Sequence, residues 1–242
     1  MNGFRVFPVL GIPEVVEGDD LGALLAERVE LEDGDVLVVS QKAVSKAEGR
    51  VVRLSDVEPS PRARELAGDH DPRRVEVVLG EAARVVRSRP PLLIAETRHG
   101  FVCASAGVDE SNAPALGVVV LLPLDPDASA ARLRARLHAL TGRRVGIVVS
   151  DSFGRPFRRG TTDVSIGAAG IETLRDLRGQ RDSNGYELRS TQIALADEIA
   201  AAAELARGKT DGIPAVVVRG LDAAGEGTAR DLVMSRGESL FS

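Results

Sequence analysis

Cysteine and aromatic residues are the residues that this 242-residue sequence has least of. Cys103 is the single cysteine, so an internal disulfide and a zinc site built from several thiolates are both excluded. We expect Cys103, which lies among apolar neighbours, to be a buried hydrophobic side chain rather than a nucleophile. Aromatic residues make up 3% of the chain and tryptophan is absent, so few rings can stack on nucleic-acid bases. A bound metal ion would have to rest mainly on oxygen.

Long apolar runs and blocks of one charge sign are also missing. Residues 116–124 form the longest apolar stretch and contain Pro123, whereas a membrane-spanning helix needs about 20 apolar residues. The N-terminus has no basic segment followed by a long apolar core, as a secretory signal would. The 31 basic and 36 acidic residues are interspersed, which argues against a nucleic-acid surface. We therefore expect a cytoplasmic protein that binds neither a membrane nor a nucleic acid.

Short apolar runs alternate with helical patterns along the whole chain. The runs that predict strands are residues 4–10, 35–39, 92–97, 101–105, 118–122, 145–149 and 215–219. The patterns that predict helices are residues 21–29, 62–68, 129–140 and 188–206, and residues 73–87 suit either a strand or a helix. No repeat or flexible linker divides the chain, so we predict one domain over residues 1–242 of the α+β, or mixed α/β, class.

Polar clusters follow several of the predicted strands, and ligands of open α/β sheets commonly bind at such strand ends. Asp109 and Asp151 each follow an apolar stretch and have a polar neighbour, Asn112 and Ser152 respectively. Carboxylate and hydroxyl oxygens suit Mg²⁺ or Mn²⁺, which often bridge carboxylates to phosphate oxygens. The alternative is that both aspartates only stabilise turns.

Two groups of basic residues lie close to these clusters: Lys42 with Lys46, and Arg155 with Arg158 and Arg159. The two lysines could neutralise phosphate, although the spacing of a P-loop is absent. The arginines could clamp a phosphorylated substrate through their forked donors. The alternative is a solvated surface turn for the lysines and ordinary surface charge for the arginines.

Five stretches of the chain, taken in order, resemble the coenzyme F420-0:L-glutamate ligase family. They are residues 38–50, 96–112, 122–127, 150–155 (Ser-Asp-Ser-Phe-Gly-Arg) and 212–220. The resemblance extends over residues 4–228 and is closest to the bacterial branch. Many bacterial members carry a C-terminal nitroreductase-like domain after the ligase region. Because this chain ends soon after that region, we expect a ligase without the second domain.

The resemblance implies a reaction, its cofactors and an assembly. The reaction is GTP-dependent addition of L-glutamate to F420-0, or to a dehydro-type precursor, followed by γ-linked addition of further glutamates. It passes through an acyl phosphate and releases GDP and phosphate. The implied cations are Mg²⁺ or Mn²⁺, with K⁺. The implied structure is the family's α+β fold, with a nucleotide-binding groove and an intertwined homodimer.

The resemblance also assigns roles to single residues. Asp109, Asp151 and Ser152 match metal-binding positions. The residues that match nucleotide contacts are Gly11, Ile12, Pro13, Glu14, Gln41, Lys42, Lys46, Asn112, Arg207, Gly208 and Lys209. Archaeal members have an acidic metal ligand near residues 207–211, where this chain has Lys209. We therefore expect Lys209 to contact phosphate rather than a metal ion.

Two other readings of the same clusters stay open at the level of sequence. One is a metal-dependent nucleotide hydrolase or phosphotransferase that uses the same groove without glutamate. The other is a binding module for a nucleotide or deazaflavin that has no turnover. Dependence of nucleotide consumption on glutamate and F420-0 separates both from the ligase.

Overall fold

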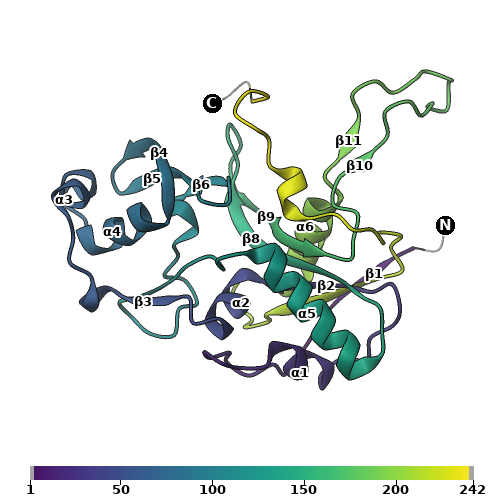
Figure 1. Ribbon diagram of the computed structural model, residues 1–242, viewed down its shortest axis with the longest axis horizontal. Coiled ribbons are helices and arrows are strands. Elements are labelled where there is room, and N and C mark those ends of the chain that lie inside the picture. Colours follow the sequence, from purple (N-terminus) through teal and green to yellow (C-terminus); the bar gives the residue numbers. More distant parts are fainter. Residues whose placement is uncertain (1–2, 240–242) are drawn as a thin grey trace.

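A five-stranded mixed β-sheet lies at the centre of the computed structural model, which describes residues 3–239 (Figure 1). The strands lie in the order β1-β12-β2-β8-β9, and β2 and β8 are the parallel neighbours. Their bounds are Arg5–Pro8 for β1, Val36–Ser40 for β2, Gly146–Gly154 for β8, Thr161–Ala169 for β9 and Ala215–Arg219 for β12. The strands predicted near residues 4–10, 35–39, 145–149 and 215–219 are therefore confirmed.

Helices cover both faces of this sheet, which explains why its inner strands are apolar at consecutive positions. Leu37 and Val39 of β2 pack into one hydrophobic cluster, and Val36 and Val38 pack into another on the opposite face. On the first face lie α1 (Leu21–Ala26), α2 (Gln41–Ala47) and α5 (Pro126–Thr141), and on the second lies α6 (Leu195–Arg207) (Figure 1). Across residues 3–239, every helix is too short or too polar to cross a bilayer.

A smaller group of elements, between residues 51 and 121, packs beside the main sheet around its own hydrophobic cluster (Figure 1). Leu54, Val78, Leu93 and Val119 are among its buried side chains. The helices of the group are η1 (Leu54–Asp56), α3 (Pro61–Ala67), α4 (Pro72–Glu81) and η2 (Ser105–Gly107). Its strands are β3 (Val51–Arg53), β4 (Ala82–Arg89), β5 (Leu92–Thr97), β6 (Val102–Ala104) and β7 (Val118–Val120). The strands predicted over residues 92–97 and 101–105 are present as β5 and β6, which pair as a hairpin, and the mixture of elements confirms the mixed α/β class.

The structure corrects one helix boundary and decides two points that the sequence left open. The helix predicted over 188–206 begins at Leu195, because the residues before it form β11 (Gln192–Ile193), which pairs with β10 (Arg175–Asp176). Residues 73–87 form a helix and then a strand, since the chain leaves α4 at Ala82 and pairs with β5. The polar residues after β2 form α2 rather than a turn. Elements β10 and β11 form the base of an arm that projects from the sheet (Figure 1). The remaining 3₁₀ helix is η3 (Ala229–Leu232).

Candidate functional site

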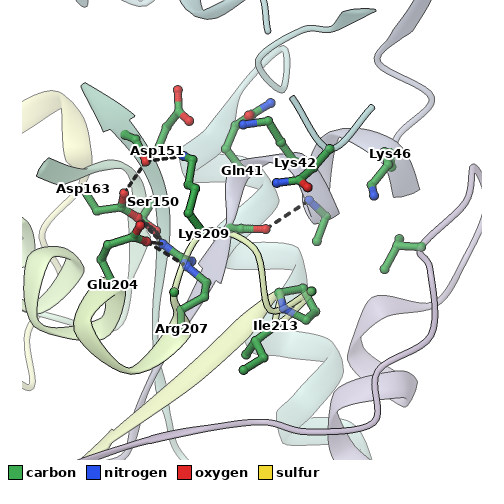
Figure 2. A pocket seen from close by; sticks show the side chains of 18 of the residues that line it. Gln41, Lys42, Lys46, Ser150, Asp151, Asp163, Glu204, Arg207, Lys209 and Ile213 are labelled. Carbon is green, nitrogen blue, oxygen red and sulfur yellow. Dashed lines mark hydrogen bonds and ion pairs between the residues drawn. The ribbon is translucent and has the colours of Figure 1, made fainter. Parts of the chain in front are cut away.

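A pocket opens where β2 ends beside β8, between the start of α2 and the end of α6 (Figure 2). Ser40 at the end of β2 pairs in register with Ser150 of β8, and because the two strands are parallel, the end of β2 meets the polar stretch that follows the apolar part of β8. The segments after β1 and before β12 close the other side. The lining residues are Pro13, Glu14, Val15, Ser40, Gln41, Lys42, Ala43, Lys46, Asn112, Ser150, Asp151, Ser152, Asp163, Glu204, Arg207, Gly208, Lys209, Gly212, Ile213 and Pro214.

Helix α2 starts directly at the end of β2 and brings three polar side chains to the pocket. Ser40 is its N-cap, with its hydroxyl oxygen facing the N–H of Ala43. Gln41 is buried and donates from its amide to Ser45 Oγ (2.6 Å) and to the carbonyl of Leu121 (2.8 Å). Its Oε1 has no hydrogen-bond partner among the described residues. Because Gln41 lines the pocket, this buried acceptor can take a hydrogen bond from a ligand.

Lys42 and Lys46 lie one helical turn apart on α2, so both ammonium groups reach the pocket. Lys42 Nζ lies 2.7 Å from Asp109 Oδ2, and Lys46 Nζ lies 2.5 Å from Glu14 Oε1. Burial opposes ionisation of Asp109, but the hydrogen bonds from Lys42 and from the N–H of Ser111 outweigh it. The pKa of Asp109 therefore lies below its ordinary value. Residues assigned separately to nucleotide and to metal thus meet in one ion pair.

Asp151 is the carboxylate whose charge the pocket neutralises least. Burial raises its pKa to about 6, and the nearby carboxylates of Asp163 and Asp109 add to this rise. The positive charge of Lys42 and the backbone N–H of Ser152 offset only part of it. The folded chain therefore ionises Asp151 less readily than the unfolded chain does, and a cationic ligand group would favour the ionised form.

On the opposite wall of the pocket, Asp163 of β9 contacts several polar side chains (Figure 2). It is 2% exposed and accepts hydrogen bonds from Ser150 Oγ (2.9 Å) and Ser152 Oγ (2.6 Å). It also forms an ion pair with Arg207 at the end of α6. Lys209 Nζ donates to Ser152 Oγ at 2.8 Å. Ser152 therefore gives its proton to one carboxylate and presents its oxygen to a cation.

Arg207 is buried, at 6% exposure, yet its hydrogen-bonding capacity is not used up. Its Nη2 donates to Ser150 Oγ (3.0 Å) and Glu204 Oε2 (3.0 Å) besides pairing with Asp163. Its Nη1 has no partner among residues 3–239. Because the side chain lines the pocket, this N–H group can meet an anionic ligand.

Most of the residues proposed from sequence meet in this pocket, and a few do not. Those that line it are Pro13, Glu14, Gln41, Lys42, Lys46, Asn112, Asp151, Ser152, Arg207, Gly208 and Lys209, with Asp109 joined through Lys42. Gly11 and Ile12 are not among the lining residues, and the carbonyl of Gly11 accepts from Arg28 Nε (3.1 Å). Arg155, Arg158 and Arg159 lie at the β8–β9 turn, where Arg155 donates to the carbonyl of Arg159 (2.8 Å).

Asp163 and Glu204 are pocket residues that sequence reasoning missed. Asp163 pairs across the β8–β9 hairpin with Ser152, so recognising that hairpin would have placed a carboxylate beside the Ser-Asp-Ser cluster. Glu204 lies one turn before the end of α6, in a helix whose pattern indicates only an amphipathic surface. Cys103 is buried as expected, and burial raises its pKa to about 12.

The donor set fits a hard divalent cation only in partnership with a ligand. Within the described part of the chain, no three His, Cys, Asp or Glu side chains are grouped to hold a metal ion. Mg²⁺ in nucleotide sites usually rests on one or two carboxylates plus phosphate oxygens, so three protein carboxylates are not required. Asp151, Asp109 and Ser152 supply oxygen donors of that kind, and a bound cation would stabilise the ionised form of Asp151 that burial disfavours.

Comparisons with known proteins identify the family of this chain. The profile of the family F420-0:Gamma-glutamyl ligase matches residues 10–220. The coenzyme F420:L-glutamate ligase of Methanopyrus kandleri is 49% identical, over 98% of this chain and 97% of the relative. That of Archaeoglobus fulgidus is 48% identical, over 98% and 96%, and that of Methanothermobacter thermautotrophicus is 43% identical, over 90% and 89%. The chain therefore belongs to the F420-0:gamma-glutamyl ligase family.

Proposed function

We propose that this chain is a GTP-dependent ligase that joins L-glutamate to F420-0 and then adds further glutamates through γ-linkages. Family membership gives the reaction class, and the relatives are named coenzyme F420:L-glutamate ligases. One observation carries the nucleotide-dependent part of the proposal. The cationic groups of Lys42, Arg207 and Lys209 converge around Asp151 at one edge of the sheet (Figure 2).

Positive charge in this pocket is held in place before any ligand arrives. Lys42 is oriented by Asp109 and Arg207 by Asp163, and both cations are largely buried. Phosphoryl transfer depends mainly on alignment and on neutralising phosphate charge, not on a side-chain nucleophile. Preorganised cations meet that need without further reorganisation.

The proposed reaction consists of two transfers. A carboxylate oxygen of the acceptor attacks the γ-phosphorus of GTP, and the bond to the GDP oxygen breaks, which forms an acyl phosphate and GDP. The amine nitrogen of glutamate then attacks the acyl carbon, the bond to the phosphate oxygen breaks, and the amine loses a proton. Lys42, Arg207 and Lys209 would hold the phosphates during both transfers. Cys103 is buried and takes no part in either transfer.

Cation binding belongs to the same proposal. Asp109, Asp151 and Ser152 would hold Mg²⁺ or Mn²⁺, with K⁺ as a further cation, and a divalent ion there would neutralise negative charge on the transferred phosphate. The ammonium group of Lys209 donates a hydrogen bond to Ser152 and so lies beside the proposed cation site, which supports a contact with phosphate. When Mn²⁺ is titrated into the GTP-bound protein, binding should saturate in the wild type, and the affinity for Mn²⁺ should be lower in Asp151→Asn.

A homodimer is also proposed. The arm between β10 and β11 carries Tyr186, which is 63% exposed, and the arm is ordered by its own hydrogen bonds, such as Asp182 N to the carbonyl of Tyr186 (2.9 Å). Such an arm is available to a second copy of the chain. Sedimentation at a mass of two chains would support the dimer, and a monomer at micromolar concentration would contradict it.

Mass spectrometry gives the direct test of the ligase. F420-0 incubated with the protein, L-glutamate, GTP and Mn²⁺ should gain mass in glutamate-sized steps, with one GDP released per step. GTP consumption that does not depend on glutamate or F420-0 would indicate a hydrolase instead. Binding of GTP and F420-0 without any mass step would indicate a binding module.

A further inference from the structure

A second cavity, of about 470 Å³, adjoins the first pocket along β8 and β9. It lies between those strands, the start of α6, and the segment that follows η3. We call it the aromatic cavity and define it by Phe101, Phe153, Val164, Asp197, Val233 and Met234. The first pocket uses none of these side chains.

The two spaces share consecutive residues of the same strand pair. Asp151, which lines the first pocket, pairs across β8 and β9 with Val164, which lines the aromatic cavity. Phe153 of the aromatic cavity is two residues after Asp151, so the three side chains lie on the same face of the strand pair. Alternate residues of a strand are about 7 Å apart, so the two spaces meet within the length of a small ligand. One elongated ligand can therefore occupy both.

Aromatic rings are scarce in this chain, and two of them meet at the aromatic cavity. The sequence has six phenylalanines, one tyrosine and no tryptophan. The rings of Phe101 and Phe153 lie edge to face, with centroids 6.2 Å apart, and His99 stacks behind Phe101 at 5.7 Å. Both phenylalanines are only partly buried and line the cavity. The two rings together form one aromatic wall, against which a planar ring can stack or pack edge to face.

The aromatic cavity also carries a polar group suited to the edge of a heteroaromatic ring. Asp197 Oδ1 accepts the N–H of Ser165 at 2.8 Å. Its other oxygen makes no hydrogen bond within residues 3–239, and burial raises the pKa of this carboxyl group. Arg84, Glu96 and Arg236 also line the cavity, and Glu96 forms ion pairs with both arginines. Polar groups that converge beside apolar and aromatic walls are typical of small-molecule sites.

We propose that the aromatic cavity binds the planar deazaflavin ring of the F420-type substrate, with the chain of the substrate extending past Phe153 into the first pocket. This inference rests on the proposed function for the identity of the substrate. The ring lies against the wall that Phe101 and Phe153 form, Asp197 meets its polar edge, and the carboxylate end reaches the phosphate-binding cations.

Binding of F420-0 without nucleotide, measured by equilibrium dialysis, tests the inference. Phe153→Leu keeps an apolar core contact but removes the ring, and Val102→Trp narrows the cavity from a side chain that is 53% exposed. Each should weaken F420-0 binding at least tenfold while GTP binding stays within twofold of wild type. The matched controls are Val102→Thr, at the same site, and Phe4→Ala, a phenylalanine outside the cavity; both should bind F420-0 as the wild type does.

Turnover measured on the same samples separates the two proposals. If the wild type adds glutamate and both cavity variants bind F420-0 normally, the ring binds elsewhere and the proposed function stands. If the variants lose F420-0 binding but the wild type adds no glutamate, the ring site holds and the ligase proposal fails. Absence of F420-0 binding by the wild type overturns both.

Discussion

Replacing Asp151 with asparagine should make the protein more stable and less active at the same time. In the folded chain the pKa of Asp151 is raised from 3.8 to about 6, chiefly by burial. A carboxyl group whose pKa is raised on folding is ionised at a cost at neutral pH, because the unfolded chain ionises it more readily. Asparagine has nearly the same shape and no charge, so Asp151→Asn removes this cost together with the charge that a phosphate-bound cation needs.

The size of the effect follows from the shift in pKa. A shift of about two units, at about 1.4 kcal/mol each, corresponds to at most about 3 kcal/mol of unfolding free energy at pH 7. The wild type should lose this stability as the pH rises from about 4 to about 6, and little more above that. The difference between the two proteins should therefore be largest above pH 7 and disappear near pH 4.

Urea unfolding in the presence of a chelator, at pH 7.5 and at pH 4, measures this difference. Asp109→Asn is the matched control in the same pocket. The pKa of Asp109 is lowered, and its loss leaves Lys42 buried without its partner, so this variant should be less stable at pH 7.5. An Asp151→Asn variant that is no more stable than wild type at pH 7.5, or whose advantage is the same at pH 4, would refute the reasoning.

Three further predictions concern the cations of the pocket. Asp163→Asn should lower the unfolding free energy by about 3 kcal/mol, because the buried guanidinium of Arg207 loses its main partner. In urea unfolding, the double variant Asp163→Asn with Arg207→Met should regain most of this stability. If the losses from the two substitutions add in full, the pairing is contradicted. Lys209→Met should raise the KM for GTP about tenfold without a change in unfolding, because Lys209 is exposed; an unchanged KM would place it outside the phosphate site. Lys42→Met should weaken GTP binding in calorimetry by a similar factor, and normal binding would remove Lys42 from the site.

The strands of the main sheet could be predicted because a buried strand shows as a run of apolar residues in the sequence. Residues 36–39 and 146–149 are apolar at almost every position, since helices cover both faces of the sheet. The parallel pairing of these strands brings two polar strand ends to one edge, where the sequence placed its candidate site. The prediction of the pocket therefore followed from the prediction of the strands.

Helix α2 could not be predicted, because its burial depends on distant partners. Gln41, Lys42 and Lys46 are polar and look like a surface turn, yet all three are at most 9% exposed. Their partners come from far along the chain, such as Leu121 for Gln41 and Asp109 for Lys42. A local pattern records which side chains are polar but not which of them will find a partner.

The ion pair between Asp163 and Arg207 was missed for a similar reason. Asp163 and Arg207 are 44 positions apart, and no spacing rule connects them. Residues that are close in sequence can also lie apart in the structure. Arg155, Arg158 and Arg159 were expected near Asp151 because they follow it closely in the sequence. The strand β8 instead carries them away from the pocket to the hairpin turn.

The single buried cysteine makes this protein convenient for site-directed spectroscopy. The thiol of Cys103 is 7% exposed and its pKa is raised to about 12, so it should react slowly with maleimides at neutral pH. A cysteine introduced at exposed Ser183, on the arm between β10 and β11, would then be the preferred labelling site. A fluorophore or spin label there would report the position of the arm directly, without first removing a native cysteine.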